Sequence, residues 1–149
     1  MKHLYAHGAA VCAFVAAFAV TGKAQSMFHR AENNVPIAII QVVRTADDIA
    51  VKLQTLRAIA KVCWTADGPN SPYLVADGRR YRYLSGDNVS ACPQRTDYAE
   101  SDIMILHFEP LDSKVRIFSL VEGEGGENQM ANAQSSDRRY WNFLRVTLN

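Results

Sequence analysis

The stretch Thr45–Ala66, TADDIAVKLQTLRAIAKVCWTA, has the most regular apolar pattern in the chain and decides the predicted fold. Its apolar residues recur at spacings of four, three, four and three, as on one face of a helix. They are Ile49, Leu53, Leu56, Ala60 and Cys63. The pattern therefore predicts one long amphipathic helix whose apolar face packs on a sheet.

Both ends of this stretch carry signals for helix boundaries. The Thr45 hydroxyl can accept the backbone N–H of Asp48, and the Asp48 side chain can reach back, as in a capping box. Asp47 and Asp48 also place negative charge where the helix dipole is positive. Gly68 suits a C-terminal cap, and Pro69 cannot continue a helix.

A β-hairpin is predicted next, because the apolar pattern changes to period two on both sides of Asp77-Gly78. Counting outward from that turn pairs Tyr73 with Arg82, Leu74 with Tyr81, Val75 with Arg80, and Ala76 with Arg79. Strand alternation then places Leu74 and Tyr81 on the core face, and Tyr73, Arg80 and Arg82 on the opposite face.

A second hairpin is predicted from 103–109 and 114–122 across Pro110–Ser113, and a last strand from 140–148. The run 35–43, VPIAIIQVV, fits either a buried strand, which its valines and isoleucines favour, or a short buried helix that begins near Pro36. Residues 25–34 are predicted to be a loose lead-in, and 123–137 a glycine-rich loop. The expected fold class is α+β, with the long helix laid on an antiparallel sheet of about five strands.

Residues 1–24 have the build of a secretory signal peptide. Lys2 precedes an uninterrupted apolar run, Ala9–Val20, which is shorter than the roughly 20 residues that a membrane-spanning helix needs. Small residues, Gly22 and Ala24, follow at the positions that signal peptidases prefer. We therefore expect a single domain, 25–149, that is periplasmic or secreted and does not span a membrane once the leader is removed.

The cysteines agree with an exported protein. Without the leader, which contains Cys12, two cysteines remain, Cys63 and Cys92. In an oxidising compartment such a pair predicts one disulfide, and its 29-residue separation stabilises the fold by roughly 3–4 kcal/mol in the chain-entropy picture. Two thiols without a nearby histidine fall short of a four-ligand metal site, so no metal is expected.

Charge and motifs exclude several function classes. Residues 25–149 have 14 basic and 15 acidic side chains, which argues against capture of nucleic acid or of an anionic membrane surface. The glycines of 123–126 lack the lysine of a phosphate-binding loop, and no nucleophile elbow of the G-x-S-x-G type is present. No cofactor is expected.

A partner-binding surface is the leading interpretation of the exposed sheet face, because tyrosine, tryptophan and arginine are enriched at binding hot spots. The candidate residues are Tyr73, Arg80 and Arg82 on the first hairpin, with Trp141, Phe143 and Arg145 on the last strand. The expected function is therefore that of a small exported non-enzymatic protein that binds another protein, for example as an inhibitor or immunity-type partner.

Two alternatives stay open. In the predicted second hairpin, His107 faces Arg116 and lies two residues from Glu109, and this polar cluster would serve acid–base chemistry if it lined a cleft. The chain would then be a small envelope enzyme, although a surface charge cluster is the more ordinary interpretation. A small-ligand carrier with a pocket between helix and sheet is the other alternative.

Overall fold

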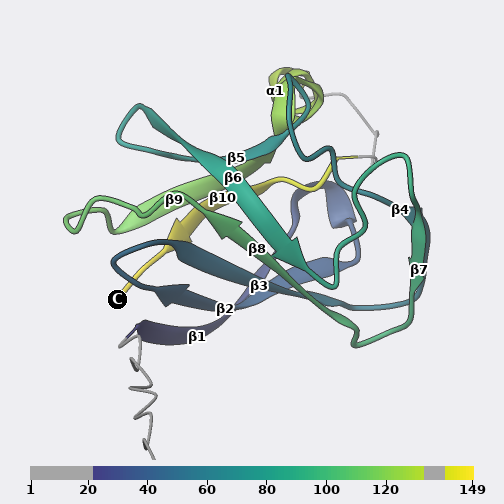
Figure 1. The fold of residues 1–149 in the computed structure, drawn as a ribbon, viewed down its shortest axis with the longest axis horizontal. Coiled ribbons are helices and arrows are strands. Elements are labelled where there is room, and N and C mark those ends of the chain that lie inside the picture. The colour runs from purple at the N-terminus through teal and green to yellow at the C-terminus, as the bar shows by residue number, and fades with distance from the viewer. Residues whose placement is uncertain (1–21, 133–139) are drawn as a thin grey trace, which may run out of the picture.

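The computed structural model of the protein describes residues 22–132 and 140–149, and its main feature is an eight-stranded antiparallel sheet (Figure 1). The strand order is β1-β2-β3-β8-β6-β5-β9-β10, and β4 and β7 form a separate two-stranded sheet. The strands are β1 Lys23–Arg30, β2 Ile37–Arg44, β3 Ile49–Thr55, β4 Ile59–Val62, β5 Pro72–Ala76, β6 Arg79–Asp87, β7 Thr96–Tyr98, β8 Ile103–Phe108, β9 Ile117–Glu122 and β10 Phe143–Thr147. A 3-10 turn, Glu32–Asn34, and one helix, α1 Gly123–Ala131, complete the described elements.

The large sheet curls until its two edge strands, β1 and β10, come close together. Side chains of β1 bridge the remaining gap to the C-terminal residues. The Gln25 amide donates to the carbonyl of Thr147 at 3.1 Å and accepts the backbone N–H of Asn149 at 2.6 Å. The Lys23 ammonium donates to the carbonyl of Asn149 at 2.8 Å. The sheet is therefore a near-barrel with one core inside it.

The core is filled with large apolar side chains that alternate along the strands with partly exposed residues. Those that are almost fully buried include Trp64, Tyr81, Phe108, Phe118, Phe143, Ile37, Ile39 and Leu53. Because side chains fill the interior, any binding site has to lie at the ends or on the outside of the near-barrel.

The α+β prediction was wrong, because the stretch expected to form the long helix folds as two strands, β3 and β4. Residues 49, 51, 53 and 55 are all buried, while the residues between them are partly exposed. That period of two fits the sequence as well as the helical period did, and pairing with β2 and β8 selects the strand. The fold is mostly β, with one short helix among the described residues.

The hydrogen bonds predicted for the helix start are present, but they shape a turn between β2 and β3. The Thr45 hydroxyl accepts the backbone N–H groups of Asp47 and Asp48, at 3.1 and 3.0 Å, and donates to Asp48 Oδ1 at 2.7 Å. Threonine side chains bond their own backbone in this way in turns as well as in helix caps.

The first predicted hairpin is confirmed in every pair. β5 and β6 align Tyr73 with Arg82 and Ala76 with Arg79, around an Asp77-Gly78 turn in which both residues have positive φ. The second predicted hairpin was wrong, since β8 pairs with β3 and β6, whereas β9 pairs with β5 and β10. Both strands of the expected hairpin are present, but each pairs with other strands of the near-barrel.

The remaining elements give a mixed outcome. Residues 37–44 form strand β2, as their valines and isoleucines favoured, and a C-terminal strand is present as β10. The lead-in prediction was wrong, because β1 occupies residues 23–30. The predicted loop contains α1 over 123–131, and its part over 133–139 lies outside the described residues. Most of the predicted leader, residues 1–21, also lies outside them.

The glycines in the predicted loop allow close packing. A Cβ on Gly126 would lie 2.5 Å from the amide oxygen of Asn142, and one on Gly125 would overlap the ring of Tyr140. Asn142 is fully buried, donates to the carbonyl of Gly126 at 3.2 Å and accepts the N–H of Glu122 at 3.1 Å. The glycines therefore let α1 lie against the segment that leads into β10.

Candidate ligand-binding groove

A groove of about 520 Å³ lies at the end of the molecule where β4 and β7 lie (Figure 1). We name it the disulfide groove. Its lining comes from β4, the Cys63–Cys92 region, the end of β9 and the segment before β10. The residues are Val35, Pro36, Ile59, Ala60, Lys61, Val62, Cys63, Trp64, Cys92, Arg95, Glu122 and Trp141.

The predicted disulfide is confirmed and forms part of this groove. Cys63 and Cys92 are bonded, with their Cα atoms 5.0 Å apart. Beside them, the Trp64 backbone N–H donates to the Ser90 carbonyl at 2.8 Å, and the Trp64 carbonyl accepts the Cys92 N–H at 2.9 Å. The disulfide and these bonds together hold the segments after β4 and before β7 next to each other. A disulfide of this kind is typical of an oxidising compartment.

Two tryptophans form the apolar base of the groove. The rings of Trp64 and Trp141 meet edge to face, with centroids 5.1 Å apart and an angle of 84° between the planes. Both residues are buried. The indole N–H of Trp64 has no hydrogen-bond partner among the described residues. A buried donor without an acceptor costs free energy, so it is a common mark of a place that a ligand or a water completes.

Glu122 provides a carboxyl group at the same place. It is only partly exposed, and its Oε2 accepts the backbone N–H of Trp141 at 2.6 Å. Burial raises the pKa of Glu122 to about 8, although the hydrogen bond from Trp141 lowers it. Burial therefore favours the protonated form of this carboxyl group, which can donate a hydrogen bond.

The outer part of the groove is cationic. Lys61 and Arg95 both line it, and both are exposed. The backbone N–H of Lys61 donates to Asp97 Oδ1 at 2.8 Å, which fixes the strand at that residue. Neither cationic side chain forms an ion pair within residues 22–132 and 140–149. The groove thus combines an aromatic base with hydrogen-bond donors and unpaired positive charge.

The first half of the predicted partner-binding surface lies together on β5 and β6. The guanidinium of Arg80 lies over the ring of Tyr73, 4.5 Å from its centroid, and both side chains bond to Glu127 of α1. Arg82 forms a 2.7 Å ion pair with Glu109. Tyr73, Arg80 and Arg82 line a second groove of about 390 Å³, together with Tyr83 and residues of the 66–72 segment. We name it the arginine groove.

Of the second half of that predicted surface, only Arg145 lies on the surface. Trp141 and Phe143 are buried, and Phe143 belongs to the core. A register shift between Phe143 and Val146 lets both residues face inward, and Arg145 between them has a φ of 54°. Arg145 is exposed and donates its backbone N–H to Ser119 Oγ. Simple alternation could not predict this bulge.

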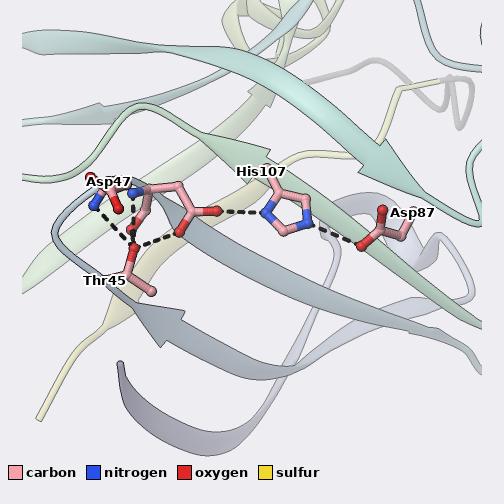
Figure 2. A network of polar contacts seen from close by, with 5 residues as sticks. Thr45, Asp47, Asp87 and His107 are labelled. Carbon is pink, nitrogen blue, oxygen red and sulfur yellow. Dashed lines mark hydrogen bonds and ion pairs between the residues drawn. The ribbon is translucent and has the colours of Figure 1, made fainter. Parts of the chain in front are cut away.

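The predicted polar cluster of His107, Glu109 and Arg116 is divided among different places. Glu109 pairs with Arg82, and Arg116 donates to the carbonyl of Ser113 at 2.9 Å. His107 lies between two other carboxylates (Figure 2). Its Nδ1 is 2.6 Å from Asp48 Oδ2, and its Nε2 is 3.2 Å from Asp87 Oδ2.

These contacts connect three neighbouring strands, because Asp48 precedes β3, His107 lies in β8, and Asp87 ends β6. Burial lowers the pKa of His107, but the hydrogen bonds to Asp48 and Asp87 raise it overall above its ordinary value. A protonated ring donates from both nitrogens, so this geometry stabilises the sheet. His107 lines neither the disulfide groove nor the arginine groove.

Sequence reasoning missed most of the disulfide groove. It identified Cys63, Cys92 and Trp141, but it gave no role to Trp64, Glu122, Arg95 or Lys61. The only signal for Trp64 was its position next to a disulfide cysteine. The position of Glu122 depends on the turn from β9 into α1, which was not predicted.

Within the described part of the chain, no group of three or more histidine, cysteine or acidic side chains is placed to hold a metal ion. No helix among the described residues is long and apolar enough to cross a bilayer. Comparison of the chain with protein-family models, with curated proteins and with solved structures finds no match.

Proposed function

We propose that this protein is an exported, non-enzymatic binding protein and that the disulfide groove holds a small organic ligand. The observation that carries the proposal is the groove itself, which is lined by two tryptophans beside the disulfide. One of them, Trp64, also has a buried indole N–H without a partner among the described residues, which costs free energy.

The size and composition of the groove support this proposal. Its volume of about 520 Å³ lies within the range of small-molecule sites, and its lining combines apolar and polar groups. Two tryptophans and the disulfide supply the apolar surface, and Glu122, Lys61 and Arg95 supply the polar groups. The disulfide also limits motion of the walls, which lowers the entropic cost of binding.

The contacts of His107 weigh against an enzyme. Both ring nitrogens already face carboxylates, and the ring joins three strands of the sheet. A general base needs a nitrogen that can reach a substrate proton. We therefore assign His107 a structural role. The leader-like segment and the disulfide together support a periplasmic or secreted location.

Ligand-observed NMR with a mixture of small organic acids, amines and alcohols tests the proposal. At least one class should show saturable binding to the wild-type protein. Ala60 is exposed and lines the groove, so Ala60→Trp should fill it without disturbing the core and should abolish binding. Circular dichroism of the variant verifies that it folds.

Ala58→Trp is the matched control, because Ala58 is also exposed but does not line the groove. It should bind as the wild type does. Absence of binding by every class, or equal binding by Ala60→Trp and wild type, would contradict the proposal.

A protein partner at the arginine groove is the second candidate. The observation in its favour is Arg82, whose side chain is 80% exposed beside Tyr73 and Tyr83. If this surface binds a protein, Arg82→Glu should weaken recovery of a stoichiometric partner from envelope extract, whereas Ala60→Trp should not. An unchanged recovery with Arg82→Glu would exclude this surface.

A further inference from the structure

We infer that the ligand of the disulfide groove is an amphipathic organic anion, with an apolar body that lies against Trp64 and Trp141 and one carboxylate that faces Arg95 and Lys61. This inference rests on the proposed function and specifies the chemical class of the ligand.

The polar side chains in the groove offer donors. The guanidinium of Arg95 and the ammonium of Lys61, which line the groove, are donors without acceptor capacity. Glu122 already uses Oε2 to accept the Trp141 N–H. Burial raises the pKa of its carboxyl group, which makes it less repulsive to an anion than an exposed carboxylate would be. A ligand rich in acceptor atoms complements this set.

The charges select an anion among such ligands. Lys61 and Arg95 form no ion pair among the described residues, although the carboxylate of Asp97 accepts the backbone N–H of Lys61, so both cationic side chains can pair with a ligand. A cationic ligand would be repelled by both groups. A carboxylate placed between them would gain a charge pair without displacing an existing one.

The apolar surface requires a ligand with a hydrophobic part. Ile59, Val62, Trp64 and the disulfide line the inner groove, and Ile59 and Val62 are only partly buried by the rest of the protein. A free inorganic anion would leave this surface uncovered. An aliphatic or aromatic carboxylate covers it and gains the free energy of apolar burial.

Titration with three probes of equal chain length tests this inference: octanoate, octylammonium and octanol. Both tryptophans of the chain line the groove, so intrinsic fluorescence reports binding there, and calorimetry gives the affinity. Octanoate should bind most tightly and octylammonium most weakly. Arg95→Gln should weaken octanoate binding about three- to tenfold, as for one partly solvated charge pair, and leave octanol binding unchanged.

Lys114→Gln is the matched control, since Lys114 is exposed and does not line the groove, and it should bind octanoate like the wild type. If octanol or octylammonium binds as tightly as octanoate, or if Arg95→Gln has no effect, the ligand class is wrong while the proposed function stands. If none of the three probes changes the fluorescence or releases heat, the ligand class is wrong, and if the ligand-observed NMR mixture also shows no binding, the proposed function is overturned as well.

Discussion

Among the single residues, His107 and Glu122 both have raised pKa values, and they have different roles. His107 is held by Asp48 and Asp87 and joins strands β3, β8 and β6. Glu122 is partly exposed in the disulfide groove, where burial raises its pKa. Each makes the stability of the protein depend on pH, and substitution separates the two effects.

Replacement of His107 by glutamine should destabilise the protein most in mildly acidic solution. The folded-state pKa of His107 is raised, so its contribution is complete below its ordinary pKa of 6.5 and is lost as the pH rises through the folded value. The pKa of Asp48 is lowered, despite burial that raises it, by its hydrogen bonds to His107 and Thr45. The contribution of Asp48 is therefore present above 3.8 and lost as the pH falls through its folded value.

The two windows overlap between pH 4 and 6.5. In urea unfolding at pH 5.5, His107→Gln should cost about 1–2 kcal/mol, and clearly less at pH 9. His29→Gln, at a partly exposed position of β1, serves as the control. An equal cost at both pH values would show that protonation of His107 has no part in the effect.

Replacement of Glu122 by glutamine should stabilise the protein in alkaline solution. The folded-state pKa of about 8 lies above the ordinary 4.5, so the stability that Glu122 contributes is complete below pH 4.5 and lost as the pH rises through 8. Glutamine cannot ionise and can still accept the Trp141 N–H. At pH 9 the variant should therefore exceed the wild type by roughly 1–3 kcal/mol, a difference that vanishes near pH 4.

The control for this measurement is Glu124→Gln, the exposed neighbour at the start of α1, whose stability should follow that of the wild type. A Glu122→Gln variant whose advantage does not grow with pH would show that the carboxyl group is ionised well below 8 in the folded protein.

Among the strands and turns, local sequence signals were enough to predict some elements and not others. The β5–β6 hairpin was predicted residue by residue because Asp77-Gly78 determines its register locally. The Thr45–Asp48 hydrogen bonds were also predicted, but they occur in turns and in helix caps alike. The strand 49–55 follows from long-range pairing with β2 and β8, which the local pattern does not contain.

The residues of the candidate site also divide into those predictable from local sequence and those placed by long-range pairing. Cys63 and Cys92 could be paired by counting, because no other cysteine lies outside the predicted leader. Trp141 was identified by residue type, but its burial depends on the register shift in β10. The contacts of His107 could not be predicted, because Asp48 and Asp87 lie 59 and 20 residues away and only the strand order brings them to the ring.

The disulfide is the element whose removal should change the groove most. Cys63→Ala combined with Cys92→Ala should lower the free energy of unfolding by roughly 3–4 kcal/mol, as expected for a closed loop of this length. The β4–β7 pair should loosen with it, because these strands pair mainly with each other. Hydrogen exchange should then increase in 59–64 and 90–98, while the β5–β6 hairpin keeps its protection. Equal loss of protection in both regions would mean that the disulfide stabilises the whole molecule rather than this end.

Over the whole molecule, packed side chains fill the interior of the near-barrel, so a ligand can bind only at its ends or on its outside. Eight strands enclose a core filled by large side chains, and bonds between β1 and the C-terminal residues nearly close the sheet. The disulfide groove is an end site where two aromatic rings lie near two cations that form no ion pair within the described part of the chain. We propose that a ligand occupies this groove.

The most direct test of that claim is the indole N–H signal of Trp64 in a proton–nitrogen correlation spectrum of the folded protein. The chain has two tryptophans, so the spectrum contains two indole signals, which Trp64→Phe and Trp141→Phe assign. Saturating octanoate should shift the Trp64 signal, because the alkyl chain of the proposed ligand lies against the Trp64 ring and changes the surroundings of its N–H. If both indole signals stay in place while the backbone amides of Tyr73 and Arg80 move, the ligand binds in the arginine groove and not in the disulfide groove.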